Sequence, residues 1–138
     1  MRPAPIAALL LGCVLARSSA AACLLSNYSV AAEWARSEAV IVATVQSQRS
    51  ISDAADPEGI GGTVYSVSVR QAFRGSVAKS VDVYSENSSG RFDLAIGQEY
   101  LLFLYRERGY LSADPCGNSG LTRNRRSALK EVQRLSSK

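Results

Sequence analysis

The sequence predicts a mainly β domain of five strands with a short helix near each end. Three stretches carry this prediction. Ala39-Val-Ile-Val-Ala-Thr-Val45 is rich in β-branched residues and apolar on both sides, which is typical of a buried strand. Apolar and polar residues alternate from Tyr65 to Phe73, as in a strand with one face in water. Tyr100-Leu-Leu-Phe-Leu-Tyr105 predicts a further strand that packs on both faces.

Shorter signals complete the set of strands. Val81 and Val83 indicate a third strand, and Gly109 allows a tight turn into a short last strand at Tyr110 to Ala113. The segment 50–62 is polar, acidic and rich in glycine, so we expect a mobile loop there. The first strand is therefore expected to end before this loop.

Helices are predicted close to both ends of the domain. Between Asn27 and Ser37 the apolar residues fall on one helical face, and Ser29 is suited to cap the start of the helix. Near the C-terminus, Leu129, Val132 and Leu135 share one face of a closing helix. Neither helix belongs to a repeat.

The first 22 residues have the pattern of a secretory signal peptide. An apolar core from Ile6 to Ala16 precedes Ala20-Ala21-Ala22, an A-x-A cleavage site directly before Cys23. This core is shorter than the roughly 20 residues that a membrane-spanning helix needs. We expect cleavage to leave residues 23–138 as a single exported domain without a transmembrane segment.

An alternative processing site lies inside the same segment. Leu10-Leu11-Gly12-Cys13 has the form of a bacterial lipobox, in which Cys13 would be lipidated and hold the chain at a membrane surface. The A-x-A site suits ordinary cleavage better. The favoured prediction is therefore an unanchored protein in the periplasm or the extracellular space.

The chain has three cysteines, and one of them leaves with the predicted signal. Cys23 and Cys116 remain, so a bridge between them is the only intramolecular pairing in an oxidising compartment. The loop-entropy model gives such a bridge roughly 3 to 5 kcal/mol of stabilisation. Two free buried thiols are the alternative, which export disfavours.

Positive charge is concentrated at the C-terminal end. The full chain has a formal net charge of +4, and Arg2 and Arg17 of that total lie in the predicted signal. From Arg123 to Lys138 there are six basic residues against one glutamate. The high pI is therefore a property of this segment. Its first arginines, Arg123, Arg125 and Arg126, are expected on the exposed side of the last helix. We therefore expect no nucleic-acid partner.

Histidine is absent from the chain. That absence excludes Ser-His-Asp and Cys-His catalysis and histidine-based metal sites, and we expect a protein that is not an enzyme and needs no cofactor. Asp53, Asp56 and Glu58 match no calcium loop, and a solvated acidic face is the favoured interpretation. Asn27-Tyr-Ser29 and Asn87-Ser-Ser89 fit the N-glycosylation pattern, which applies only in a host with that machinery.

Cys23 has a second use if it begins the mature chain. Its α-amine would have a pKa of about 8, so that an appreciable fraction is neutral and able to bind a metal. The alternative is that the bridge only anchors the N-terminal segment. The residues alone favour this alternative, because stapling is the usual role of a disulfide in a small secreted domain.

After Cys23 and the short helix, four stretches resemble a known family. They are Ser37-Glu-Ala-Val-Ile-Val-Ala-Thr-Val45, Tyr65-Ser-Val-Ser-Val with Phe73-Arg-Gly75, Gly97-Gln-Glu-Tyr-Leu-Leu-Phe103 and Cys116-Gly-Asn-Ser119. The chain resembles the netrin-like module in these stretches. It is most similar to the tissue inhibitors of metalloproteinases and their short bacterial relatives.

This resemblance implies a five-stranded OB-type Greek-key barrel. In the inhibitors of the family, the N-terminal cysteine chelates the catalytic zinc of a protease through its amine and carbonyl groups, and the next residue enters the substrate pocket. By position, Cys23 would be the chelator and Leu24 the pocket-filling side chain, while the isolated protein would hold no metal. The chain begins Cys23-Leu-Leu where the animal inhibitors begin Cys-x-Cys.

The resulting hypothesis is an exported, non-enzymatic binding protein with a protein partner, in its sharpest form an inhibitor of zinc metalloproteases. The alternative is an envelope or surface interaction protein without a protease contact, in which the disulfide is only a staple. Oligonucleotide or glycan binding on the barrel face is disfavoured. Export separates the protein from nucleic acid. Few aromatic residues are left for stacking once Tyr65, Phe73, Tyr100 and Phe103 are assigned to strands.

Overall fold

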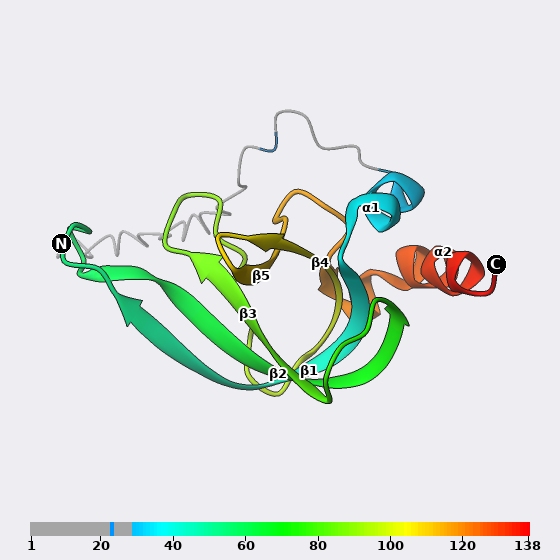
Figure 1. Ribbon diagram of the computed structural model, residues 1–138, viewed down its shortest axis with the longest axis horizontal. Helices are drawn as coiled ribbons and strands as arrows, with labels where there is room; N and C mark the ends of the chain where they lie inside the picture. Colours follow the sequence, from blue (N-terminus) through cyan, green and yellow to red (C-terminus); the bar gives the residue numbers. More distant parts are fainter. Residues whose placement is uncertain (1–22, 24–28) are drawn as a thin grey trace, which may run out of the picture.

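The computed structural model describes Cys23 and residues 29–138 (Figure 1). The predicted signal segment 1–22, which contains Cys13, lies outside the described residues. Leu24 and Asn27 lie outside them as well. From residue 29 onward the chain forms one strongly curved sheet with a helix near each end of this part.

Five strands close into a barrel. Their bounds are β1 Ala39–Ser52, β2 Ile60–Arg74, β3 Ser80–Glu86, β4 Glu99–Glu107 and β5 Tyr110–Ala113. Neighbouring strands follow the order β1-β2-β3-β5-β4, and β4 pairs with β1 to close the ring. Every pair is antiparallel except β3 with β5, which run parallel. This topology confirms the predicted mainly β, OB-type Greek-key barrel.

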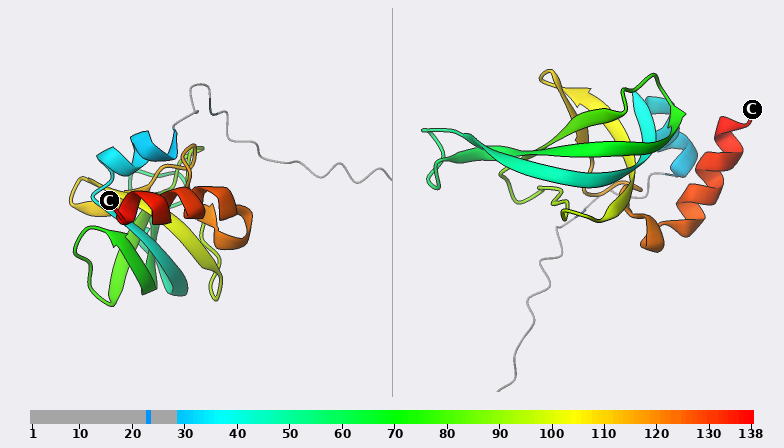
Figure 2. Two further views of the ribbon diagram at one scale, coloured as in Figure 1. Left: turned by 90° about the vertical axis from the view of Figure 1, so that its right-hand side faces the viewer. Right: turned by 90° about the horizontal axis from the view of Figure 1, so that it is seen from below.

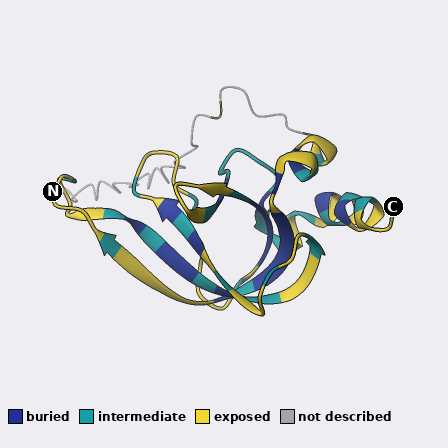
Figure 3. Ribbon diagram, in the orientation of Figure 1, coloured by how far each residue is buried: buried dark blue, intermediate teal, exposed yellow. Residues whose placement is uncertain are grey.

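The barrel wall separates two apolar clusters, which explains why β1 and β4 are apolar on both faces. Alternate residues of β1, such as Ile41, point into the barrel and pack against Leu102 and Leu104 of β4. The intervening residues, such as Val40, face outward and pack with Phe103 under the helices. Because successive strand residues point to opposite faces, β1 is buried on both sides from Ala39 to Val45, and β4 from Tyr100 to Leu104 (Figure 3).

The two helices lie on the same side of the barrel (Figure 2). Helix α1 spans Val30–Arg36, and the Oγ of Ser29 accepts a hydrogen bond from the Ala32 N–H at 3.1 Å, which confirms the predicted cap. Helix α2 spans Arg126–Ser136 and buries Val132 completely against the barrel wall. In the described part of the chain, the search for helices long and apolar enough to cross a membrane found none.

Two short elements before α2 were not predicted. Strand β6 (Gly120–Leu121) pairs with β4, and the 3₁₀ helix η1 (Thr122–Asn124) follows it. The prediction that Arg123, Arg125 and Arg126 lie on the last helix is wrong for Arg123, which belongs to η1, and for Arg125. This residue precedes α2, is only partly exposed, and donates from Nε to the Ser119 carbonyl at 3.1 Å.

The predicted loop at 50–62 is also wrong in its bounds. β1 continues to Ser52 and β2 begins at Ile60, so that only residues 53–59 form the connection. Burial ends at Val45, where the sequence predicted the strand to end, but the pairing with β2 continues. The β1 half of the hairpin beyond Val45 is mostly exposed, whereas the paired β2 residues Gly62 and Val64 are buried (Figure 3). The exposed β1 half has no apolar alternation by which its sequence could be recognised.

Candidate functional site

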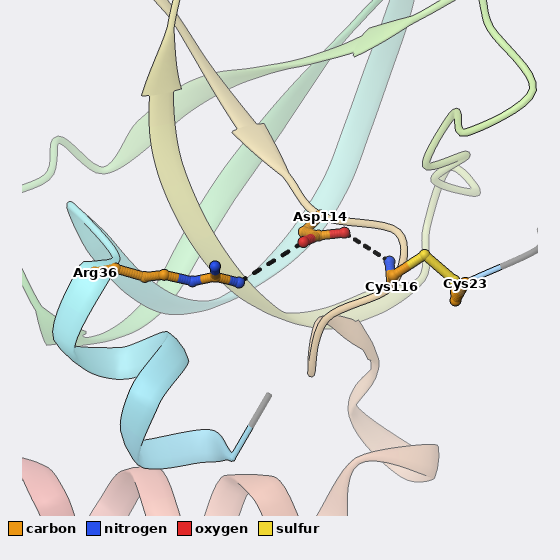
Figure 4. Close-up of a disulfide and its surroundings, with 4 residues drawn as sticks. All are labelled: Cys23, Arg36, Asp114 and Cys116. Carbon is orange, nitrogen blue, oxygen red and sulfur yellow. Dashed lines mark hydrogen bonds and ion pairs between the residues drawn. A yellow bond between two sulfur atoms is a disulfide. The ribbon is translucent and has the colours of Figure 1, made fainter. Parts of the chain in front are cut away.

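Cys23 and Cys116 form a disulfide, as predicted, across 93 residues of sequence (Figure 4). Their Cα atoms are 5.6 Å apart. Cys23 is exposed, whereas Cys116 is partly buried in the loop between β5 and β6. The bridge therefore joins an exposed position to a loop that is part of the fold.

The loop around Cys116 is held by Asp114. One carboxylate oxygen of Asp114 accepts a hydrogen bond from the Cys116 N–H at 2.8 Å, and its carbonyl accepts one from the Gly117 N–H at 3.1 Å. The other carboxylate oxygen lies 3.7 Å from the Arg36 guanidinium of α1 (Figure 4). These contacts fix the turn and connect it to the helix.

Glu33 of α1 holds the loop from the opposite side. Only 2% of this residue is exposed, and its Oε2 accepts hydrogen bonds from the Asn118 N–H at 2.6 Å and the Asn118 Nδ2 at 2.7 Å. A Cβ at position 117 would lie 2.1 Å from Oε1, so only glycine fits beside the carboxyl group. We call Glu33, Asp114, Cys116, Gly117 and Asn118 the disulfide base.

Glu33 was not predicted to be a site residue. The available signal was an acidic residue between Val30 and Trp34, on the side of α1 that packs against the barrel. A carboxyl group on such a face needs hydrogen-bond donors, and the Cys116-Gly-Asn loop supplies them. Sequence reasoning could have predicted that need but not the partner, because 85 residues separate Glu33 from Asn118.

A cavity of about 240 Å³ lies beside the disulfide base. It is lined by Glu33, Arg36, Ser37, Tyr105 and Asp114. Burial raises the pKa of the Tyr105 phenol, and the negative charges of Glu107 and Asp114 raise it further. The phenol is therefore uncharged at neutral pH and can serve as a hydrogen-bond donor to this cavity.

The other polar residues considered in the sequence have local structural roles. Asp53 and Asp56 accept hydrogen bonds within their own turn, from the Ala55 N–H at 2.9 Å and the Glu58 N–H at 2.8 Å. Asn87 donates from Nδ2 to the Ile60 carbonyl at 2.9 Å. Over Cys23 and residues 29–138, no three histidine, cysteine, aspartate or glutamate side chains are grouped to hold a metal ion.

No protein-family model matches this chain, and the search of curated proteins returned no match. What the site can do is therefore argued from its own geometry. An exposed residue is bonded covalently to a turn that hydrogen bonds and an ion pair hold against α1. Such an arrangement limits the movement of the backbone groups at Cys23, which lowers the entropic cost of binding through them.

Proposed function

We propose that the protein is an exported binding protein that contacts a protein partner through the end of the mature chain at Cys23. Inhibition of a zinc endopeptidase is the sharpest form of this proposal. The observation that carries it is the exposed position of Cys23 combined with its covalent attachment to the disulfide base. The resemblance to the netrin-like inhibitors suggests zinc chelation by the N-terminal cysteine as the mechanism.

The zinc-binding step depends on removal of residues 1–22. In the uncleaved chain the nitrogen of Cys23 is part of a peptide bond and has no lone pair to offer a metal. Cleavage after Ala22 converts it to an amine with a pKa of about 8, which is partly neutral at physiological pH. The amine and the Cys23 carbonyl would then chelate a catalytic zinc together, with one donor replacing the bound water and the other making the zinc five-coordinate. Leu24 would follow into the substrate pocket.

The test compares two forms of the protein against a panel of zinc endopeptidases. One form begins at Cys23, and the other carries one additional N-terminal alanine that returns the Cys23 nitrogen to a peptide bond. We expect the first form to inhibit at least one protease and the second to lose most of that inhibition. Circular dichroism should show the same fold for both. The chelation mechanism fails if neither form inhibits, or if both inhibit equally.

A second candidate function is supported by the disulfide itself. In this version the protein is an envelope or surface interaction protein, and the bridge only holds the N-terminal segment to the barrel. The internal bonding of the disulfide base favours it, because a structural staple needs such an anchor. It predicts that Cys23→Ser lowers thermal stability while interactions with partner proteins, measured in a pull-down from the native secretome, are kept.

A further inference from the structure

The junction of β3 and β5 is the weakest point of the barrel wall. These strands are joined by one residue pair, Val83 with Leu111, whereas β1 and β2 pair along nearly their whole length. Beyond that pair lies a half-open groove of about 160 Å³, bordered by the segment 88–92. We call it the seam groove. It is smaller than the roughly 300 to 1,000 Å³ of pockets for drug-sized ligands, so it suits a single ring.

Aromatic side chains are concentrated around the seam groove. Four of the ten aromatic residues of the chain line it: Tyr84, Phe92, Tyr105 and Tyr110. Glycan binding was disfavoured from the sequence because four aromatic residues were assigned to strands, which left few for stacking. These four are Tyr65, Phe73, Tyr100 and Phe103. The structure changes this expectation, because Tyr84 and Tyr110 form a stacked pair with ring centroids 4.9 Å apart.

In the stacked pair, Tyr84 is fixed by its surroundings and Tyr110 is partly exposed. The Tyr84 hydroxyl donates to the Gly61 carbonyl at 3.0 Å, and a Cβ at position 62 would lie 2.5 Å from the Tyr84 ring, so the ring rests directly on the backbone of Gly62. Tyr110 packs on that fixed ring and still has 44% of its surface exposed. Tyr110 therefore offers exposed aromatic surface at the groove and is held in place by the fixed Tyr84 ring.

Polar groups surround this apolar face. Among the residues that the structure describes, Glu107 takes part in no ion pair, and its carboxylate can accept hydrogen bonds. Arg108 adds guanidinium donors at the rim. Its φ of 50° lies in the left-handed region, which costs free energy for an arginine. Such strain is typical of residues kept for a purpose other than stability.

The charges of the groove indicate a neutral ligand. Arg91 lies 3.4 Å from Asp93, and Arg108 lies 3.7 Å from Glu86, so the two arginines are already compensated. Glu107 adds a negative charge that would repel phosphate, sulfate or carboxylate groups. An extended peptide is also disfavoured, because the Phe92 N–H, which could otherwise pair with a peptide backbone, already donates to the Ser85 Oγ at 2.9 Å.

We propose that the seam groove binds one ring of a neutral saccharide, with the apolar face of the sugar on Tyr110 and its hydroxyl groups on Glu107 and Arg108. A pyranose combines one apolar face with a rim of hydroxyl groups, which are the two features that the groove offers. This site is independent of the proposed contact through Cys23. It would give the protein a second, glycan-binding activity.

The test is an NMR titration of the ¹⁵N-labelled protein with its disulfide formed. The probes are glucose, maltotriose and the trimer of N-acetylglucosamine, with a heparin-derived oligosaccharide as the acidic comparison. We expect at least one neutral sugar to shift the amide signals of 84–92 and 107–113, with a dissociation constant on the order of 1 mM. Tyr110→Ala should weaken this binding by about tenfold or more.

Matched variants separate stacking from a general loss of structure. Tyr110→Phe keeps the ring and should keep the binding. Ile96→Ala removes an exposed apolar side chain outside the groove and should also leave the binding unchanged. The proposal is overturned if none of the three neutral sugars shifts these signals, if Tyr110→Ala binds as tightly as the parent protein, or if only the acidic oligosaccharide binds there.

Discussion

Tyr105 lines both the seam groove and the cavity beside the disulfide base, yet the base and the groove are built in opposite ways. In the base, a carboxyl group that is 2% exposed receives two hydrogen bonds, and the neighbouring glycine leaves no free space. In the groove, one residue pair joins β3 and β5, and Tyr110 keeps 44% of its surface exposed.

This difference indicates a division of tasks. Bonds that are satisfied inside the fold contribute to stability and offer little to a ligand, whereas exposed and strained groups contribute little to stability and are available for binding. Substitutions in the base should therefore lower the free energy of unfolding more than substitutions in the groove. The groove should tolerate substitution with small changes in stability and larger changes in binding.

Loss of the disulfide is expected to have the largest effect. Replacing Cys23 and Cys116 together by serine removes a cross-link over 93 residues, which should lower the free energy of unfolding by about 4 kcal/mol. For a domain of this size the melting temperature would fall by about 15 °C. Scanning calorimetry of the two proteins measures this. An unchanged melting temperature would mean that the base holds the N-terminal segment without contributing to global stability.

Glu33→Ala should have the next largest effect. It removes the carboxyl oxygen that accepts two hydrogen bonds from Asn118 and leaves a space inside the loop, so we expect a loss of about 3 kcal/mol in urea denaturation. Glu38→Ala is the matched control. It breaks an exposed ion pair with Arg106 and should change stability little. If both variants lost the same free energy of unfolding, the burial of Glu33 would not be what makes its hydrogen bonds important for stability.

The barrel could be predicted from the sequence, because burial on two faces leaves a dense apolar pattern in β1 and β4. The turn Arg108-Gly109 and the cap at Ser29 could be predicted too, since each depends on neighbours in the chain. The part of β1 beyond Val45 could not, because its residues are mostly exposed and leave no apolar pattern.

The functional regions were predictable only in part. The disulfide followed from counting cysteines, a rule that requires no knowledge of the fold. The bond between Glu33 and Asn118 and the stack of Tyr84 on Tyr110 both join residues distant in sequence. Their geometry depends on how β3, β5 and α1 are arranged in space, which hydrophobic periodicity does not contain. Both regions are therefore products of the topology.

Tyr105→Phe tests the burial of the phenol that lines both the seam groove and the cavity beside the disulfide base. Burial, followed by the charges of Glu107 and Asp114, raises the pKa of Tyr105, so the folded state favours the neutral phenol. Its contribution to stability is present below the ordinary tyrosine pKa of about 10 and is lost as pH rises through the higher folded pKa. The variant should lose stability less steeply above pH 10 in urea denaturation. Parallel alkaline profiles of variant and parent would show that Tyr105 is solvated in the native state.

Arg108→Asn should have the smallest effect and the opposite sign. Asparagine tolerates the left-handed backbone at φ 50°, so the variant should be more stable by about 0.5 to 1 kcal/mol. The ion pair with Glu86 offsets little of this gain, because the two side chains are 81% and 58% exposed. Saccharide binding in the NMR titration should weaken by a few-fold, because the guanidinium donors are lost.

The adjacent glycine provides the control for this last comparison. Gly109 has a φ of 87°, a backbone conformation that glycine adopts without strain and alanine does not. Gly109→Ala should therefore lower the free energy of unfolding by about 1 kcal/mol. A gain of stability in Arg108→Asn together with a loss in Gly109→Ala would show that the turn conformation is needed and that arginine is less stable in it than asparagine. If Arg108→Asn instead lowers stability, Arg108 is a structural part of the seam, and its strain is no argument for a ligand.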